Sequence, residues 1–169
     1  IPLPLIFPLR FNKHSAILGL LSFDKGGIPM LVSTKGRYAL RVMLELAQSQ
    51  PDAYMPLPLI AQRQGISEKY LESIIAILSR AGLVEGLRGK GGGYRLTRSS
   101  AKYSVGEILR LTEGSLAPVT CLEGAENPCP RAGECTTLPM WQKLDDLINT
   151  YLDSVSLSDL LSQTDGNAL

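Results

Sequence analysis

The chain has 169 residues, of which 44% are hydrophobic, a length and composition that suit one globular domain with additional segments. Its formal net charge of +1 hides an uneven distribution: residues 31–102 hold 11 Lys and Arg against 5 Asp and Glu, whereas residues 103–169 hold 3 against 10. This division predicts a basic face for a polyanion, while three cysteines clustered within fifteen positions exclude a secreted disulfide framework and favour a cytoplasmic protein.

Residues 1–29 are expected to form a loosely ordered leader or N-terminal extension. They contain four of the chain's 11 prolines and its only histidine, His14, which is expected to be solvated. Prolines and Arg10 interrupt the apolar runs, and no basic region precedes a clean apolar segment. We therefore expect neither a signal peptide nor contact with a membrane.

Residues 30–102 are predicted to form one folded unit that begins with a helix over 33–48. Apolar side chains recur at helical spacing along one face of this helix, namely Ala39, Val42, Met43, Leu46 and Ala47. The helix is therefore expected to belong to the core. Lys35 and Arg37 lie near its start, where basic side chains could contact the phosphates of a nucleic acid.

The segment 57–82 has the pattern of a helix-turn-helix. A first helix must end near Gly65, because glycine accepts the left-handed conformation that turns a chain out of a helix. Ser67 is then a suitable N-cap for a second helix with an apolar stripe of Leu71, Ile74, Ile75 and Leu78. The exposed start of the second helix reads base edges in such folds, so the predicted contact residues are Ser67, Glu68, Lys69, Tyr70 and Glu72.

A β-hairpin is predicted next, from Leu83 to Thr97, with a glycine-rich tip around Lys90. A nucleotide-binding loop is excluded, because Gly91 follows Lys90 where a phosphate-binding loop needs Ser or Thr, and Tyr94 replaces the last glycine of a dinucleotide fingerprint. Basic side chains opposed only by Glu85 surround the tip and suit a DNA groove or a phosphate backbone: Arg88, Lys90, Arg95 and Arg98. The pattern predicts a mainly α winged helix-turn-helix, with protein interaction as the alternative use.

Residues 103–136 are predicted to contain a connecting helix and a cysteine loop. Ser104 and Glu107 have the spacing of a capping box, and the helix should end at Gly114. Residues 115–136 lack periodicity, are rich in proline and glycine, and hold all three cysteines: Cys121, Cys129 and Cys135. A loop of this length inside a compact chain is usually functional.

The cysteine spacing favours an iron–sulfur cluster over a structural zinc ion. Seven residues separate Cys121 from Cys129 and five separate Cys129 from Cys135, whereas zinc sites use pairs roughly two to four residues apart. Iron–sulfur thiolates lie on irregular loops whose backbone amides can donate to the sulfurs. A thiol sensor and inert cysteines remain alternatives. A nucleophilic cysteine would need a base, and the only histidine is in the leader, so we expect no enzymatic activity.

Residues 137–162 are predicted to form a long helix and a short terminal helix, followed by a tail over 163–169. Apolar residues in the long helix recur at spacings of 3, 4, 3 and 4, as in an a/d seam: Trp141, Leu144, Ile148, Tyr151 and Val155. Such a seam packs either within its own domain or against another chain. We expect a homodimer through residues 138–155.

From Met30 to Leu161 the chain resembles the Rrf2 family of bacterial transcription regulators, and in particular its iron–sulfur members of the IscR type. The resemblance is carried by the segments STKGRYAL, RQGISEKYLE, LVEGLRGKGGGYRL and SVGEIL, by the three-cysteine loop and by Trp141. It implies a homodimeric winged-helix regulator of cluster-assembly or sulfur-metabolism genes. It also implies an operator in double-stranded DNA, long C-terminal helices that cross at the dimer interface, and a 2Fe-2S cluster on the three cysteines.

The resemblance further implies roles for individual residues. The recognition helix would enter the major groove with base contacts from Ser67, Lys69 and Glu72, and Arg88 of the wing would enter the minor groove. The IscR type takes its fourth cluster ligand from a histidine three residues after the last cysteine, where this chain has Leu138. The spacing between the first two cysteines is two residues longer in this chain than in the IscR type. The fourth ligand is therefore unknown. Nitric oxide, redox state and cysteine supply, which other members of the family sense, stay open as signals.

Overall fold

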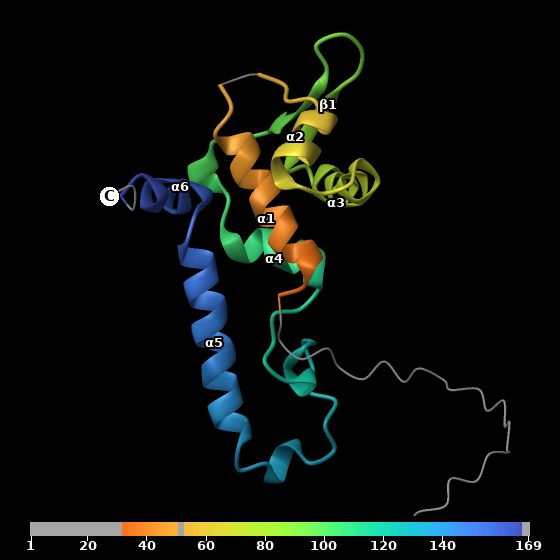
Figure 1. Cartoon of the computed structure of the whole chain (residues 1–169). Helices are drawn as coiled ribbons and strands as arrows, with labels where there is room; N and C mark the ends of the chain where they lie inside the picture. Colours follow the sequence, from red (N-terminus) through yellow and green to blue (C-terminus); the bar gives the residue numbers. More distant parts are fainter. Residues whose placement is uncertain (1–31, 51–52, 167–169) are drawn as a thin grey trace, which may run out of the picture.

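A computed structural model of the chain describes residues 32–50 and 53–166. The predicted leader over 1–29, with His14, lies outside the described residues, as does the end of the predicted tail. Helices and one small sheet form a winged unit, and one long helix, α5, projects from it (Figure 1). The mainly α winged helix-turn-helix predicted from the sequence is confirmed.

Three helices build the first part of the winged unit: α1 (Thr34–Ala47), α2 (Leu57–Gln64) and α3 (Glu68–Arg80). Gly65 ends α2 in the predicted left-handed conformation, with φ of 64°. The Ser67 hydroxyl accepts a hydrogen bond from the amide of Tyr70 and so caps α3, as expected. The apolar faces of the three helices meet in one core, which includes Met43, Ile60 and Leu71, all fully buried.

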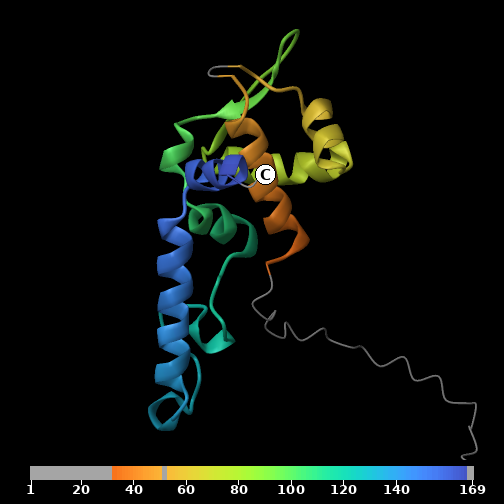
Figure 2. The same cartoon turned by 60° about the vertical axis from the view of Figure 1, so that its left-hand side comes forward.

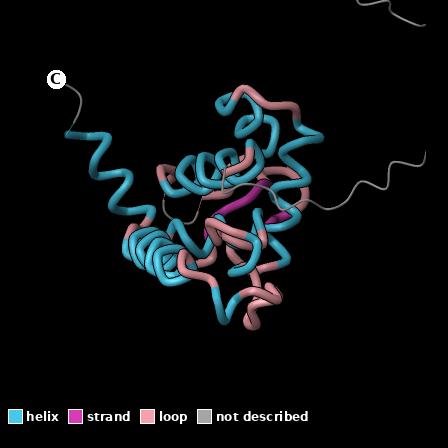
Figure 3. The backbone as a smooth tube through the Cα atoms, turned by 90° about the horizontal axis from the view of Figure 1, so that it is seen from below, coloured by secondary structure: helices cyan, strands magenta, loops and turns pink. Residues whose placement is uncertain are grey.

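The wing is an antiparallel pair of strands, β1 (Val84–Leu87) and β2 (Gly93–Leu96), with a register from Val84↔Leu96 to Leu87↔Gly93. An extended segment before α2 also pairs with β2, because Met55 and Tyr94 exchange two backbone hydrogen bonds of 2.9 Å. A Cβ atom on Gly93 would overlap the carbonyl of Met55, so glycine is required for this close approach. Figure 3 shows the strands among the helices of the unit.

The chain then passes through a short 3-10 helix, η1 (Ser100–Lys102), into α4 (Val105–Glu113), which packs against α1. Half of the predicted capping box forms: Ser104 Oγ accepts from the amide of Glu107, but the Glu107 carboxylate pairs with Arg98 instead of returning to Ser104. The last helix, α6 (Leu157–Gly166), extends beyond the short terminal helix that the sequence predicted. Its Leu157 is fully buried in the main core.

Helix α5 (Leu138–Ser154) carries two apolar stripes, and the single predicted seam is in part wrong. Ile148 and Val155 pack within their own chain against Leu109 of α4 and its neighbours. A second stripe beside it, with spacings of 4, 3 and 4, is exposed and comprises Met140, Leu144, Leu147 and Tyr151; we call it the outward stripe. The sequence pattern mixed the two stripes because both follow helical periodicity.

The segment between α4 and α5 is irregular, as expected, apart from the 3-10 turns η2 (Thr120–Leu122) and η3 (Ala132–Glu134). It runs beside the first half of α5, and in both side views it lies at the end of the molecule opposite the wing (Figures 1 and 2). Among the described helices, none combines the length and the apolar character that a membrane crossing requires.

Candidate nucleic-acid interface and cysteine loop

The start of α3 presents most of the predicted base-contact residues. Ser67, Glu68, Lys69 and Glu72 are all exposed. Tyr70 differs from them: it is half-buried, and its ring meets that of Tyr38 edge to face, with the ring centroids 6.0 Å apart. The aromatic pair ties α3 to α1, so the polar side chains around Tyr70 stand on a fixed helix.

The tip of the wing presents two of the predicted cations, Arg88 and Lys90, both exposed. Gly89 and Gly91 take positive φ angles of 95° and 78°, which L side chains rarely adopt, so the tight tip depends on them. Leu87 at the end of β1 is 49% exposed beside Arg88. A narrow ribbon with cations at its tip can enter a DNA groove.

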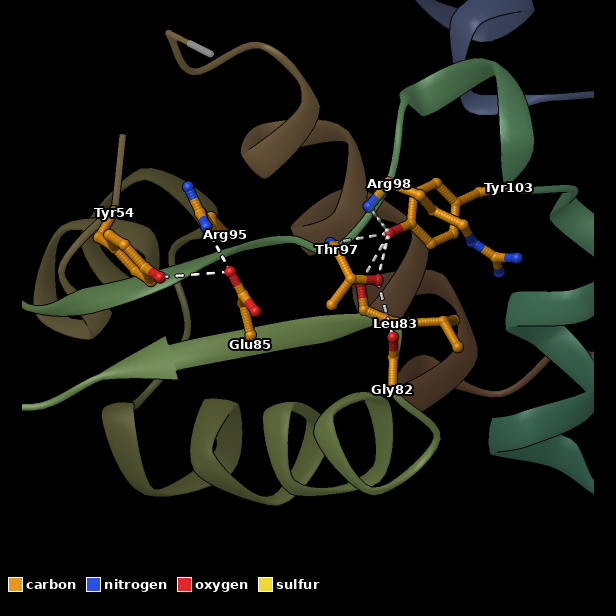
Figure 4. Close-up of polar contacts among 8 residues, drawn as sticks. All are labelled: Tyr54, Gly82, Leu83, Glu85, Arg95, Thr97, Arg98 and Tyr103. Atoms are coloured by element: carbon orange, nitrogen blue, oxygen red, sulfur yellow. Dashed lines mark hydrogen bonds and ion pairs between the residues drawn. The ribbon is translucent and has the colours of Figure 1, made fainter. Parts of the chain in front are cut away.

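The two other cations predicted at the tip lie at the base of the wing (Figure 4). Arg95 Nε is 2.5 Å from Glu85 Oε1, and its guanidinium lies over the ring of Tyr54. The hydrogen bond from Arg95 lowers the pKa of Glu85 below its ordinary value, and the hydroxyl of Tyr54 adds a second hydrogen bond. Arg98 pairs with Glu107, and this pairing raises the pKa of Arg98. Arg95 therefore stabilises the hairpin, and contact of Arg95 with DNA remains a prediction.

At the start of α1, Arg37 is exposed and donates to the hydroxyl of Thr34, while Lys35 is half-buried. Ser33 caps this helix through its hydroxyl, which accepts from the amide of Gly36 at 3.2 Å. The same hydroxyl donates to Glu113 Oε1 at 2.8 Å. An N-terminal cap of this kind holds the first turn, and with it the two cations, in one orientation.

The three cysteines are all half-buried free thiols in the loop. Across residues 32–50 and 53–166, no three Cys, His, Asp or Glu side chains are gathered closely enough to hold a metal ion. The thiols as placed here therefore do not fit a cluster, although thiolates are the donors that iron–sulfur clusters require. Leu138, at the position of the expected fourth ligand, is the first residue of α5.

Cys135 has the most distinctive environment of the three. Its Sγ lies 3.4 Å from the hydroxyl of Thr137, at the start of α5. The Thr137 hydroxyl, then the backbone amides of Thr137 and Leu138 and the charge of Arg131 lower the pKa of the thiol. A thiol at a helix start with a lowered pKa has more thiolate character, which favours both metal binding and oxidation.

Comparison with known proteins shows which family the chain belongs to. The profile of the Rrf2 family, described as iron-dependent transcriptional regulators, matches residues 32–163. The chain belongs to the Rrf2 family. Its relatives include the HTH-type transcriptional regulator CymR of Bacillus subtilis, which is 41% identical over 81% of this chain and 94% of that protein. The HTH-type transcriptional regulator IscR of Yersinia pseudotuberculosis is 35% identical over 80% of this chain and 82% of its own.

Solved structures agree with the sequence comparison. IscR of T. potens superposes with a TM-score of 0.65 at 37% identity, covering 82% of this chain and 91% of that one. CymR of Bacillus subtilis, described there as the global cysteine regulator, gives the same TM-score at 36% identity, covering 79% and 97%. This Rrf2 protein is thus a transcriptional regulator similar to both an IscR and a CymR.

Two residues that contact the elements of the interface from behind were not singled out from the sequence. Glu113 accepts a hydrogen bond from Ser33, 80 positions away, and Tyr103 bonds the base of the wing from outside the hairpin. Contacts this distant in sequence leave no periodic signal. Tyr103 precedes the capping box in the sequence, but it is buried in a core built from several helices, including Leu157 of α6, which a local pattern does not reveal.

Proposed function

We propose that this Rrf2 protein binds a specific operator in double-stranded DNA, with α3 in the major groove and the wing in the adjacent minor groove. The support comes from four exposed polar residues at the capped start of α3, next to a ribbon that carries Arg88 and Lys90 at its tip. Phosphate contacts from Lys35 and Arg37 at the start of α1 would position the unit. Glu68, Lys69 and Glu72 supply donors and acceptors suited to base edges.

A mobility-shift assay on random duplex pools at moderate salt tests the proposal. Specific DNA binding predicts that a sequence is enriched, that Arg88→Ala weakens binding to it, and that Arg80→Ala, at the far end of α3, leaves binding unchanged. An unenriched pool would favour the alternative, a winged helix that contacts proteins. The affinities need to be compared at one salt concentration, because phosphate contacts make binding strongly salt-dependent.

We further propose that the regulator acts as a homodimer through α5. Leu147 and Tyr151 on the outward stripe are 55% and 67% exposed, and four large apolar side chains in one row are unusual on a solvated helix. A second copy would cover this stripe symmetrically. Two copies of α3 would then read half-sites about one helical turn, roughly 34 Å, apart.

For the signal, we propose that the loop around Cys121, Cys129 and Cys135 is the effector site. A 2Fe-2S cluster, which implies a rearranged loop and a fourth ligand from elsewhere, is supported by the donor type and by the resemblance to IscR proteins. Thiol chemistry without metal is supported by the lowered pKa of Cys135 and by the resemblance to CymR, described as a cysteine regulator. Both candidates use the same three thiols.

Anaerobic purification separates the two candidates. A cluster predicts visible absorption with iron and sulfide in equal amounts, all lost in the triple Cys→Ala variant. Thiol sensing predicts colourless protein whose DNA affinity changes on oxidation and is restored by a reductant. If the protein is colourless and its DNA affinity changes neither on oxidation nor on reduction, the loop is not the effector site.

A further inference from the structure

We infer that Tyr103 is a positioning residue for DNA binding, which sets the orientation of the wing relative to the C-terminal helices. The inference rests on the proposed role of the wing tip in DNA contact. Tyr103 lies outside the wing, just before α4, and its side chain is fully buried. No charge or exposure marks it as part of the DNA-binding surface.

The hydroxyl of Tyr103 joins the two ends of the hairpin. It donates to the carbonyl of Leu83, just before β1, at 2.8 Å. It accepts from the amides of Thr97 and Arg98, just after β2, at 3.0 Å each. The Thr97 hydroxyl lies 3.1 Å from the same oxygen and itself donates to Gly82 (Figure 4). One buried hydroxyl therefore satisfies three backbone groups at the point where both strands leave the core.

The ring and the backbone of Tyr103 are held as firmly as its hydroxyl. The guanidinium of Arg98 lies over the ring, 4.3 Å from its centroid, and is itself paired with Glu107 of α4. The carbonyl of Tyr103 accepts from the amide of Leu157 at 3.1 Å, and the next residue, Ser104, pairs with Ser156 in a β-bridge. The junction between α5 and α6 is thus connected through one residue to the base of the wing.

This arrangement gives a reason for a tyrosine at a site where phenylalanine would fill the same space. Without the hydroxyl, the carbonyl of Leu83 would keep only the longer bonds, of 3.3 Å each, that it accepts from the amide and the hydroxyl of Thr97. The shorter bonds of the Tyr103 hydroxyl to Leu83, Thr97 and Arg98 would be lost, and the base of the hairpin would open more readily. The tip, with Arg88, would then sample several directions, and binding would have to select one of them.

Tyr103→Phe is the test, with two readouts. In the absence of DNA, amide hydrogen exchange in the wing, residues 84–97, should become about tenfold faster, while α1 and α3 keep their protection. Affinity for the duplex that the parent protein enriches from a random pool should fall about tenfold, and in an Arg88→Ala background by less than twofold. Thr112→Val, which removes a buried hydroxyl that donates to carbonyls of its own helix, α4, should change neither readout.

Parent-like exchange and affinity in Tyr103→Phe would overturn the inference. If Tyr103→Phe lowers the affinity by the same factor in the parent and in the Arg88→Ala background, the inference is also overturned. The tyrosine would then act on the whole fold and not through the wing tip. If Tyr103→Phe does not fold, the exchange of the Thr97 and Arg98 amides in the parent decides: the inference predicts protection as strong as that of the paired amides of β1 and β2, and fast exchange of both would overturn it. If the parent enriches no duplex, the proposed function fails, but the exchange measurement still decides whether Tyr103 holds the wing.

Discussion

Glu113 accepts two hydrogen bonds from Ser33, one from the hydroxyl at 2.8 Å and one from the backbone amide at 3.3 Å. Ser33 is the N-cap of α1, and Glu113 is the last residue of α4, directly before Gly114 and the cysteine segment. The contact therefore joins the entry of the proposed effector loop to the start of the helix that carries the proposed phosphate contacts. A change in the loop that moved Glu113 would remove the partner of the α1 cap.

Glu113→Ala should lower the free energy of unfolding by about 1–2 kcal/mol, because the Ser33 hydroxyl and amide lose a charged acceptor. Urea denaturation followed by circular dichroism measures this change. Glu126→Ala removes an exposed carboxylate from the loop and should change stability by less than about 0.5 kcal/mol. Equal effects from the two variants would mean that Glu113 is an ordinary surface residue.

Gly36→Ala should destabilise the protein, although alanine normally favours a helix by about 1 kcal/mol over glycine. A Cβ atom on Gly36 would overlap the carboxylate of Glu113 and crowd Leu109. Combining the substitution with Glu113→Ala should remove most of the penalty, because the overlapping group is gone. Thermal melting of the two single variants and the double variant gives the comparison. A penalty that is unchanged in the double variant would place the obstruction elsewhere.

Leu147→Asp should convert the proposed dimer into a monomer without unfolding the winged unit, because it puts a charge on the outward stripe of α5. Sedimentation velocity measures the mass, and circular dichroism reports the fold. Gln142→Asp introduces the same charge at another exposed position of α5 and should leave the mass unchanged. Ile148→Asp is a poorer choice, because Ile148 packs within its own chain and its substitution would damage the fold. A dimer mass for Leu147→Asp would exclude this stripe as the interface.

Much of the fold follows from local signals in the sequence. Gly65, Ser67 and Gly114 mark helix ends through backbone conformation and capping, and these effects act within one turn. Which residues of α5 are buried could not be predicted in the same way. The stripe that packs within the chain and the stripe that is exposed have the same helical period, so the sequence pattern does not separate them. The ion pair of Arg95 with Glu85 could not be predicted either. It depends on the strand register, which sets the two residues opposite each other.

The wing should lose stability in acid through Glu85. Hydrogen bonding to Arg95 lowers the pKa of Glu85 in the folded protein, so the ionised pair stabilises the fold above the unfolded pKa and this contribution is lost as the pH falls through the folded pKa. Glu85→Gln should therefore melt below the parent at neutral pH, and the two curves should converge in acid. If the difference in melting temperature between the parent and Glu85→Gln is the same at neutral and at acid pH, the charge of Glu85 is not involved.

Base recognition by α3 is the central claim, and selection from a random duplex pool, run in parallel with the parent and with Glu72→Ala, tests it most directly. The parent should enrich a nearly palindromic sequence with half-sites about one helical turn apart. Glu72→Ala should enrich a sequence that differs at the same position in each half-site, since one base contact is worth about 1–3 kcal/mol. Identical sequences from both proteins, or no enrichment by the parent, would contradict the account.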